Sequence, residues 1–119
     1  MIEDKTLLTK IVEGIQEKKG KGIKVVDLSG IDSASTRCFV VCSGTSGMHV
    51  AAVADSVREY VQQKIDVKPY NYDGYQNAQW IVLDYGTIFV HVFLPEYRER
   101  YNLEQLWSDA HIADVPDLD

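Results

Sequence analysis

A chain of 119 residues, of which 45% are hydrophobic and 25% charged, predicts one folded domain over residues 1–119 with a core that needs no disulfide bonds. No apolar run reaches the roughly 20 residues that span a bilayer, and the acidic N-terminal stretch lacks a secretory signal pattern, so we expect a cytoplasmic protein that does not insert into membranes. The net charge of −6 argues against direct binding to nucleic acid and favours a basic protein partner.

The first half of the chain has the pattern of a helix, two strands and a second helix. Asp4 can cap the first helix, which ends at the lysine- and glycine-rich run of residues 18–22. Residues 24–28 predict a short strand. Residues 37–43 are almost continuously apolar, a pattern typical of a central strand that is covered on both faces. Apolar residues at helical spacing over 50–65 predict the second helix.

The second half begins with a weaker pattern and then becomes clearly β-structured. Residues 67–75 contain Pro69, which argues against a central strand, so they predict an irregular edge strand and turn. Residues 78–93 predict a hairpin. Together with a polar connection at 30–35, this order of elements indicates a single-domain α/β (α+β) fold, with a mixed β-sheet of about five strands flanked by helices.

The segment after the hairpin is predicted to be helical and then irregular. Pro95 breaks the sheet and can start a helical turn. Asn102 can cap a short helix over 103–107, with Gln105 as its capping-box partner. The acidic tail after Ala110 is expected to fray.

The predicted hairpin has two contrasting faces, because side chains alternate along a strand. Gly86 can supply the positive φ that a two-residue turn at 85–86 needs. The expected pairs are then Asp84 with Thr87, Val82 with Phe89, Trp80 with His91 and Ala78 with Phe93. One face is uniformly aliphatic and is assigned to the core: Ile81, Leu83, Ile88, Val90 and Val92.

The other hairpin face carries aromatic and charged side chains, and a dense Arg, Tyr, Glu and Trp segment follows it. Aromatic groups supply contact area and interspersed charges supply orientation, so the mixture predicts a surface that recognises a partner. In the alternative interpretation, Trp80, Phe89 and Phe93 lie under residues 97–107 and form a second small core. The predicted partner-binding residues are Trp80, Asp84, Tyr85, Phe89 and His91 on the hairpin, with Glu96, Arg98 and Tyr101 beside them.

The cysteines and histidines do not form a metal-binding pattern. Cys38 and Cys42 fall on one face of the predicted strand, on the order of 13 Å apart, which is too far for a disulfide. They are expected to be reduced and buried. The three histidines are scattered along the sequence, so no metal and no cofactor are predicted.

The turn Ser43-Gly44-Thr45-Ser46 joins the central strand to a helix N-terminus and allows two interpretations. Free amides and the helix dipole can bind an anion there, as a divergent metal-dependent nucleotidyltransferase would require. That enzyme also needs paired carboxylates for Mg²⁺, and no two acids alternate along any predicted strand. A tight turn at Gly44 and a helix cap at Ser46 explain the sequence better, because the P-loop lysine is absent. His91 has no serine in a nucleophile elbow, so no catalytic residue is assigned.

Four segments resemble the ribosomal silencing factor family, also known as the RsfS/Iojap proteins. They are FVVCSGTS at 39–46, DG at 73–74, WIVLDYGTIFVHVF at 80–93 and RERYNLEQLW at 98–107, and the resemblance covers nearly the whole chain. It implies a topology similar to that of nucleotidyltransferases, without catalysis. It also implies binding to the large ribosomal subunit through its protein number fourteen, with a steric block to association with the small subunit. Translation would thereby be repressed under nutrient limitation, and family members can also self-associate, which implies a homodimer.

Overall fold

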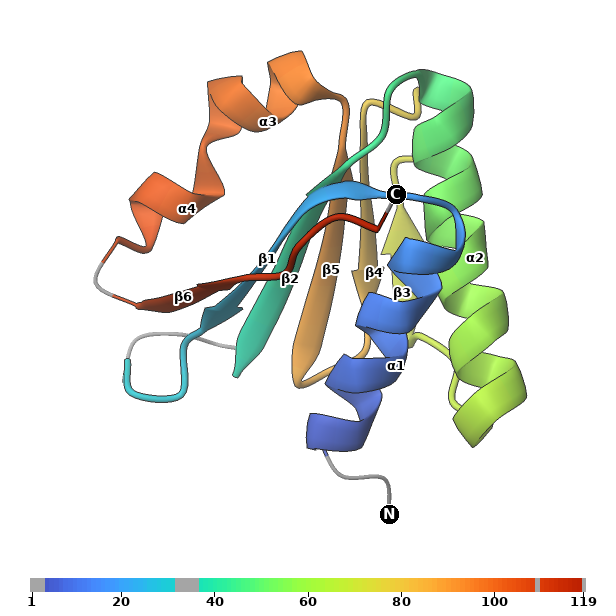
Figure 1. Cartoon of the computed structure of the whole chain (residues 1–119), viewed down its shortest axis with the longest axis horizontal. Helices are drawn as coiled ribbons and strands as arrows, with labels where there is room; N and C mark the ends of the chain where they lie inside the picture. Colours follow the sequence, from blue (N-terminus) through green and yellow to red (C-terminus); the bar gives the residue numbers. More distant parts are fainter. Residues whose placement is uncertain (1–3, 32–36, 109, 119) are drawn as a thin grey trace.

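The computed structural model describes residues 4–31, 37–108 and 110–118, so the predicted loop at 30–35 lies largely outside the described residues (Figure 1). Within the described ranges, none of the helices is long and apolar enough to cross a bilayer. The helices are α1 (Asp4–Glu17), α2 (Gly47–Ile65), α3 (Pro95–Tyr101) and α4 (Leu103–Leu106). The strands are β1 (Lys21–Asp27), β2 (Cys38–Ser43), β3 (Asn71–Asp73), β4 (Trp80–Asp84), β5 (Ile88–Phe93) and β6 (His111–Asp114).

The strands form one mixed sheet in the order β3-β4-β5-β2-β1-β6, which confirms the predicted α+β class with one strand more than expected. β2 and β5 run parallel at its centre, and the other neighbouring pairs are antiparallel. Parallel strands need a crossover connection, which here contains α2, β3 and β4. The central position of β2 explains its apolar sequence, because residues 38–42 are all buried.

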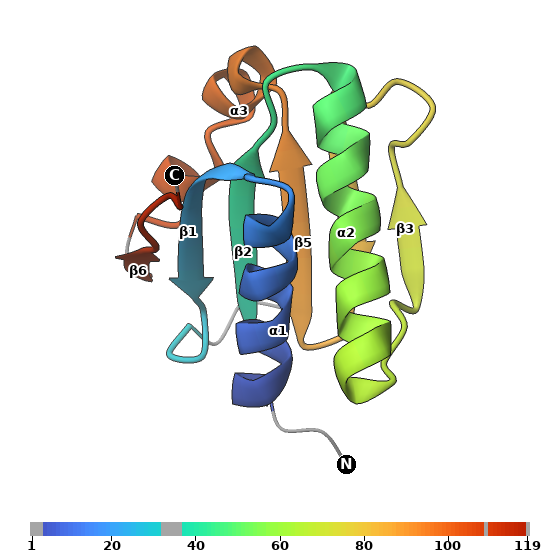
Figure 2. The ribbon, with the colours of Figure 1, turned by 45° about the vertical axis from the view of Figure 1, so that its right-hand side comes forward.

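Helices α1 and α2 lie side by side on one face of the sheet and enclose the main core with it (Figure 2). The buried polar residue on α2, Ser56, donates its hydroxyl to the carbonyl of Gly14 on α1 at 2.7 Å, and this bond ties the two helices together. The sheet supplies the aliphatic hairpin face that the sequence predicted. Its residues Ile81, Leu83, Ile88, Val90 and Val92 are all buried in this core.

Both cysteines lie in the same core as free thiols, as predicted. Burial raises the pKa of Cys38 and of Cys42 to about 12, so both stay protonated at neutral pH. They therefore act as small apolar side chains rather than as nucleophiles.

The opposite face of the sheet carries a second, smaller core. Phe39, Val41 and Phe93 form its buried centre, and α3 and α4 cover part of it (Figure 1). The half-buried side chains that pack against it include Trp80 and Phe89 of the hairpin and Tyr97, Leu103 and Trp107 of the C-terminal segment. The second-core interpretation is therefore correct in part: Phe93 is fully covered, whereas Trp80 and Phe89 are only half-buried.

The hairpin keeps its predicted faces but not its predicted register. The observed pairs include Trp80 with Phe93, Val82 with His91 and Asp84 with Phe89, so the predicted pairs were wrong by two residues. The turn lies one residue later than predicted, at Gly86 and Thr87, with Gly86 at φ +86° and the Tyr85 N–H donating to the Ile88 carbonyl at 2.9 Å. A shift of two residues preserves the alternation of side chains, so the aliphatic face stays inside.

Two predictions near the C-terminus were wrong. The tail after Ala110 was expected to fray, but His111–Asp114 form β6, which pairs antiparallel with β1 at the edge of the sheet. Asn102 stands before α4, but its side chain makes no cap bond to the backbone and instead donates to the Gln105 side-chain oxygen at 2.6 Å. β1 also begins at Lys21 rather than at residue 24, and its pairing with β2 is irregular between Lys21 and Lys24.

Candidate protein-binding face

We call four of the partly exposed aromatic side chains on the second core the aromatic face: Trp80, Phe89, His91 and Tyr101. β4 and β5 position the first three, and α3 positions Tyr101, which is 49% exposed. The Trp80 ring packs against both Phe93 and Tyr101, with centroid distances of 5.0 and 4.7 Å, and the latter two rings lie 6.5 Å apart. Phe93 is fully buried beneath them. The face is therefore a rigid patch supported by packed side chains.

The imidazole of His91 lies in the aromatic face and is uncharged at neutral pH. Trp80 Nε1–H donates to His91 Nδ1 at 3.0 Å, and the edge of the Phe39 ring packs against the imidazole at a centroid distance of 5.3 Å. Burial lowers the pKa of His91 to about 4. Because Nδ1 accepts a hydrogen bond, the proton of the neutral ring is on Nε2. At neutral pH the centre of the face is thus aromatic and neutral.

Asp84 and Tyr85 were both predicted to join this surface, and the structure separates them. Asp84 lies opposite Phe89 at the end of β4, half-buried, and its Oδ1 accepts from the Gly86 N–H at 2.8 Å. It places a carboxylate at the border of the aromatic face. Tyr85 continues the alternation of Ile81 and Leu83, so its side chain is 4% exposed in the main core. The prediction that Tyr85 contributes to this surface was wrong.

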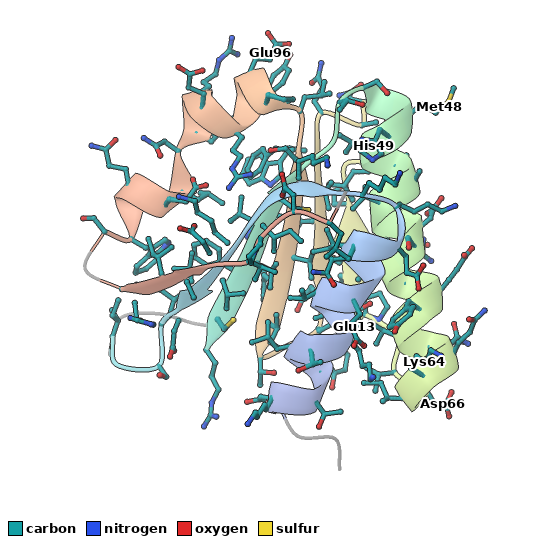
Figure 3. All side chains as sticks on the ribbon, in the orientation of Figure 1. Glu13, Met48, His49, Lys64, Asp66 and Glu96 are labelled. Carbon is teal, nitrogen blue, oxygen red and sulfur yellow. The ribbon has the colours of Figure 1, made fainter. Side chains whose placement is uncertain are left out.

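Arg98 ties the C-terminal segment to the sheet. Its Nε and Nη2 lie 2.9 and 2.8 Å from Glu104 Oε1, and its Nη1 donates to Ser43 Oγ at 2.9 Å. The Arg98 and Glu104 side chains are only 15% and 17% exposed. Glu96, in contrast, is exposed on the outer side of α3 (Figure 3). Arg98 therefore links α3, α4 and β2, while Glu96 lies at the periphery of the face.

The turn at residues 43–46 uses its polar groups to begin α2. The N–H of Gly44 donates to the Phe93 carbonyl, and the N–H of Thr45 donates to His49 Nδ1, both at 2.9 Å. Ser46 Oγ accepts from the N–H of His49, in the first turn of α2 (Figure 3), at 3.1 Å, which confirms Ser46 as the helix cap. Among the residues that the structure describes, no cluster of three or more His, Cys, Asp or Glu side chains could hold a metal ion.

A contribution from β3 to this surface was not predicted from the sequence. Its three residues border a hollow of about 460 Å³ that continues the open part of the sheet face next to Phe89. The other residues around this hollow are Val82 and Asp84. The sequence feature that could have indicated it is the alternation of Tyr70 and Tyr72 after Pro69, which is typical of an edge strand with exposed aromatic side chains.

The fold and this face define a class of protein: a small α+β domain whose partly bare sheet surface presents a rigid aromatic patch with carboxylates at its border. Aromatic residues at the centre and charges at the rim are typical of surfaces that bind other proteins. Within this class, the family model described as "Ribosomal silencing factor during starvation" matches residues 2–119. The chain belongs to the ribosomal silencing factor family.

Similar proteins agree with this assignment. The chain is 34% identical over 115 residues to the ribosomal silencing factor RsfS of Halalkalibacterium halodurans, covering 96% of both chains. It is 33% identical to the RsfS protein of Bacillus subtilis over 115 residues, covering 96% of this chain and 95% of that protein. A mouse protein named mitochondrial assembly of ribosomal large subunit protein 1 is 32% identical over 100 residues, which cover 82% of this chain and 43% of the mouse protein.

Solved structures have the same fold. A crystal structure of a Chromobacterium violaceum protein superposes with a TM-score of 0.83 at 30% identity, covering 90% of this chain and 88% of the other. A crystal structure from Bacillus halodurans gives a TM-score of 0.76 at 29% identity, covering 98% and 99% of the two chains.

Proposed function

We propose that this protein represses translation by binding the large ribosomal subunit in the cytoplasm, through the subunit's protein number fourteen. While bound there, it occupies the surface that the small subunit needs and so blocks subunit association. Family membership supports the ribosome as the partner. The aromatic face is the observation that supports a direct protein–protein contact.

The chemistry of the aromatic face suits a basic protein surface. Trp80 and Tyr101 offer anchor groups that are already held in place by Phe93, so little side-chain entropy is lost on binding. His91 is neutral and places no positive charge against a basic partner. Asp84 lies at the border of the face, Glu96 is exposed on α3, and the whole chain has a net charge of −6. Electrostatic attraction should therefore guide the two proteins together.

The names of the relatives support the large subunit as the target. One relative is named for assembly of the ribosomal large subunit. A ligand that acts by occlusion blocks association only while it is bound. It must therefore be present in amounts comparable to the large subunits, and it leaves both subunits chemically unchanged. These two properties distinguish occlusion from enzymatic inactivation.

A subunit-joining assay tests the proposal. Purified large and small subunits are mixed with increasing amounts of the protein and separated on a sucrose gradient. Joined particles should disappear as the protein approaches equivalence with the large subunits, and they should reappear after the protein is washed away. Full joining at saturating protein would overturn the proposal, as would a block that works at substoichiometric amounts or that survives removal of the protein.

Two substitutions at exposed apolar side chains link the assay to the aromatic face. Tyr101→Ala removes an anchor that is 49% exposed, so folding should be retained while subunit binding falls at least tenfold, a typical loss for an interface anchor of about 2 kcal/mol. Met48→Ala is the matched control, because Met48 is 85% exposed at the start of α2 (Figure 3). Helix α2 covers the opposite face of the sheet. Equal binding by both variants would exclude the aromatic face as the contact surface.

A further inference from the structure

The sheet has an open edge at β3. This strand lies at one end of the strand order and, among the described residues, pairs only with β4. Its three residues, Asn71–Asp73, are all exposed, and Tyr72 is 52% exposed. Open sheet edges present N–H and C=O groups in the spacing that an extended peptide can join as an additional strand. The edge is short, so specificity must come mainly from the surfaces on either side of it.

A hollow lies on each side of this edge. The hollow on the helix side has a volume of about 330 Å³, and the hollow on the sheet-face side has a volume of about 460 Å³. Tyr72 borders both of them. Successive side chains of an added strand point to opposite faces. One extended segment can therefore fill the two hollows at the same time.

The sheet-face hollow has the chemistry of a site for a basic side chain. Asp73 and Asp84 border it, together with the Phe89 side chain and residue Tyr72, and its lining residues include no cation. Each carboxylate uses Oδ1 to accept a backbone N–H at 2.8 Å, from Gly74 and Gly86 respectively. These hydrogen bonds orient the two carboxylates and involve Oδ1 only, not Oδ2. A guanidinium or ammonium group would gain both ionic and cation–π contacts here.

The helix-side hollow differs in charge. Asp55 and Glu59 are balanced there by Arg58 and Lys68. The Arg58 guanidinium lies 3.9 Å from the centre of the Tyr72 ring and 3.9 Å from Asp55 Oδ1, so it is already engaged within the protein. This side suits a small polar side chain without charge, such as threonine or serine.

We propose that the β3 edge binds an extended segment of a partner protein as an additional strand. An arginine or lysine of that segment enters the sheet-face hollow between Asp73 and Asp84, and its small polar neighbours face α2. The site shares Phe89 and the bordering Asp84 with the aromatic face but lies apart from the Trp80 and Tyr101 anchors, and it does not depend on the ribosomal assignment.

A designed peptide tests this site on the full chain. The probe is acetyl-Thr-Val-Thr-Arg-Thr-Val-Thr-amide, in which arginine and valine share one face and threonine the other. NMR titration of the ¹⁵N-labelled protein should shift the amide signals of residues 70–73. A peptide with glutamate in place of arginine should bind about tenfold more weakly or worse. A peptide with proline after the arginine lacks an N–H in the strand and should also lose binding.

Variants of the protein locate the contact. Asp73→Asn and Asp84→Asn keep an oxygen for the Gly74 and Gly86 N–H groups, so the fold is preserved while each should weaken the arginine peptide about tenfold. Asp114→Asn, on β6 at the opposite edge, is the matched control and should bind as the parent does. Tyr101→Ala should also bind the peptide normally, so this proposal and the ribosomal one can fail independently.

Several results would overturn the proposal. They are the absence of binding, equal binding of the glutamate peptide, equal loss with Asp114→Asn, or signal changes at β6 or Tyr101 instead of β3. Changes at residues 70–73 that depend on protein concentration without peptide would also overturn it, since a second copy of the chain would then occupy the edge.

Discussion

Replacing Arg98 by alanine should destabilise the protein and loosen α3 and α4 from the sheet. The change removes three contacts at once, two to Glu104 Oε1 and one to Ser43 Oγ. It leaves the Glu104 carboxylate, which is only 17% exposed, without its ionic partner. The cost of that stranded charge exceeds the net value of the ion pair itself, because the carboxylate has lost most of its hydration.

The expected loss follows from the burial of the pair. Removing one partner of a fully buried ion pair costs about 3–5 kcal/mol, and exposed pairs contribute about 0–1 kcal/mol. Since Arg98 and Glu104 are 15% and 17% exposed, a loss of about 2 kcal/mol is expected. For a domain of this size, that loss corresponds to a decrease in Tm of about 8 °C.

Thermal and urea unfolding, followed by circular dichroism and tryptophan fluorescence, measure this loss. Arg100→Ala is the matched control, because Arg100 is exposed on the same helix and lies 5.3 Å from the Tyr97 ring centre. It should cost about 0.5 kcal/mol or less. The double variant Arg98→Ala with Glu104→Gln should recover about 1 kcal/mol, since it no longer strands a charge. Equal effects of Arg98→Ala and Arg100→Ala, or no recovery in the double variant, would show that the Arg98–Glu104 pair does not stabilise the fold in this way.

Three further predictions follow from the cap, the buried imidazole and the acidic border. Ser46→Ala removes the α2 cap and should cost about 1 kcal/mol in urea unfolding, and an unchanged midpoint would contradict it. The pKa of His91 is lowered from 6.5 to about 4, so the unfolded chain binds a proton that the folded chain excludes. The free energy of unfolding should therefore fall as the pH decreases from about 6.5 toward 4, and His91 should cause no further decrease below that pH. His91→Gln should lack this part of the pH dependence. Identical pH dependence in the two proteins would disprove the prediction. Asp84→Lys should weaken large-subunit binding in co-sedimentation at low salt by placing a positive charge against a basic partner, and unchanged binding would remove Asp84 from the interface.

The hairpin shows why the sequence predicted faces better than contacts. Alternation along residues 80–93 assigns Ile81 to one side and Trp80 to the other, whichever residues form the turn, provided that the register moves in steps of two. The turn itself was placed one residue too early, because Gly86 can take either position in a two-residue turn. Tyr85 was assigned to the turn for the same reason, although it continues β4 into the main core. Local sequence could not decide between these alternatives.

Other features could not be predicted because they depend on distant residues. β6 has four mostly exposed residues and no clear alternation, and it becomes a strand only because β1 offers an edge. Arg98 was predicted to be a partner-binding residue because it lies in a charged segment. It instead bonds to Ser43, which is 55 positions away in the sequence. The predicted register placed Trp80 directly opposite His91, whereas the true register places them diagonally in neighbouring cross-strand pairs, and the bond between them still forms.

The strand order has a consequence for how the chain folds. β3, β4 and β5 are neighbours in sequence and can pair as soon as they are made. The pairing of β6 with β1, and the bond from the Gly22 N–H to Asp117, join groups up to 95 positions apart, so they close very long loops. We infer that the C-terminal strand is added last during folding and detaches first during unfolding. Amide exchange in β6 should then be fast, while that in β2 and β5 should report global unfolding.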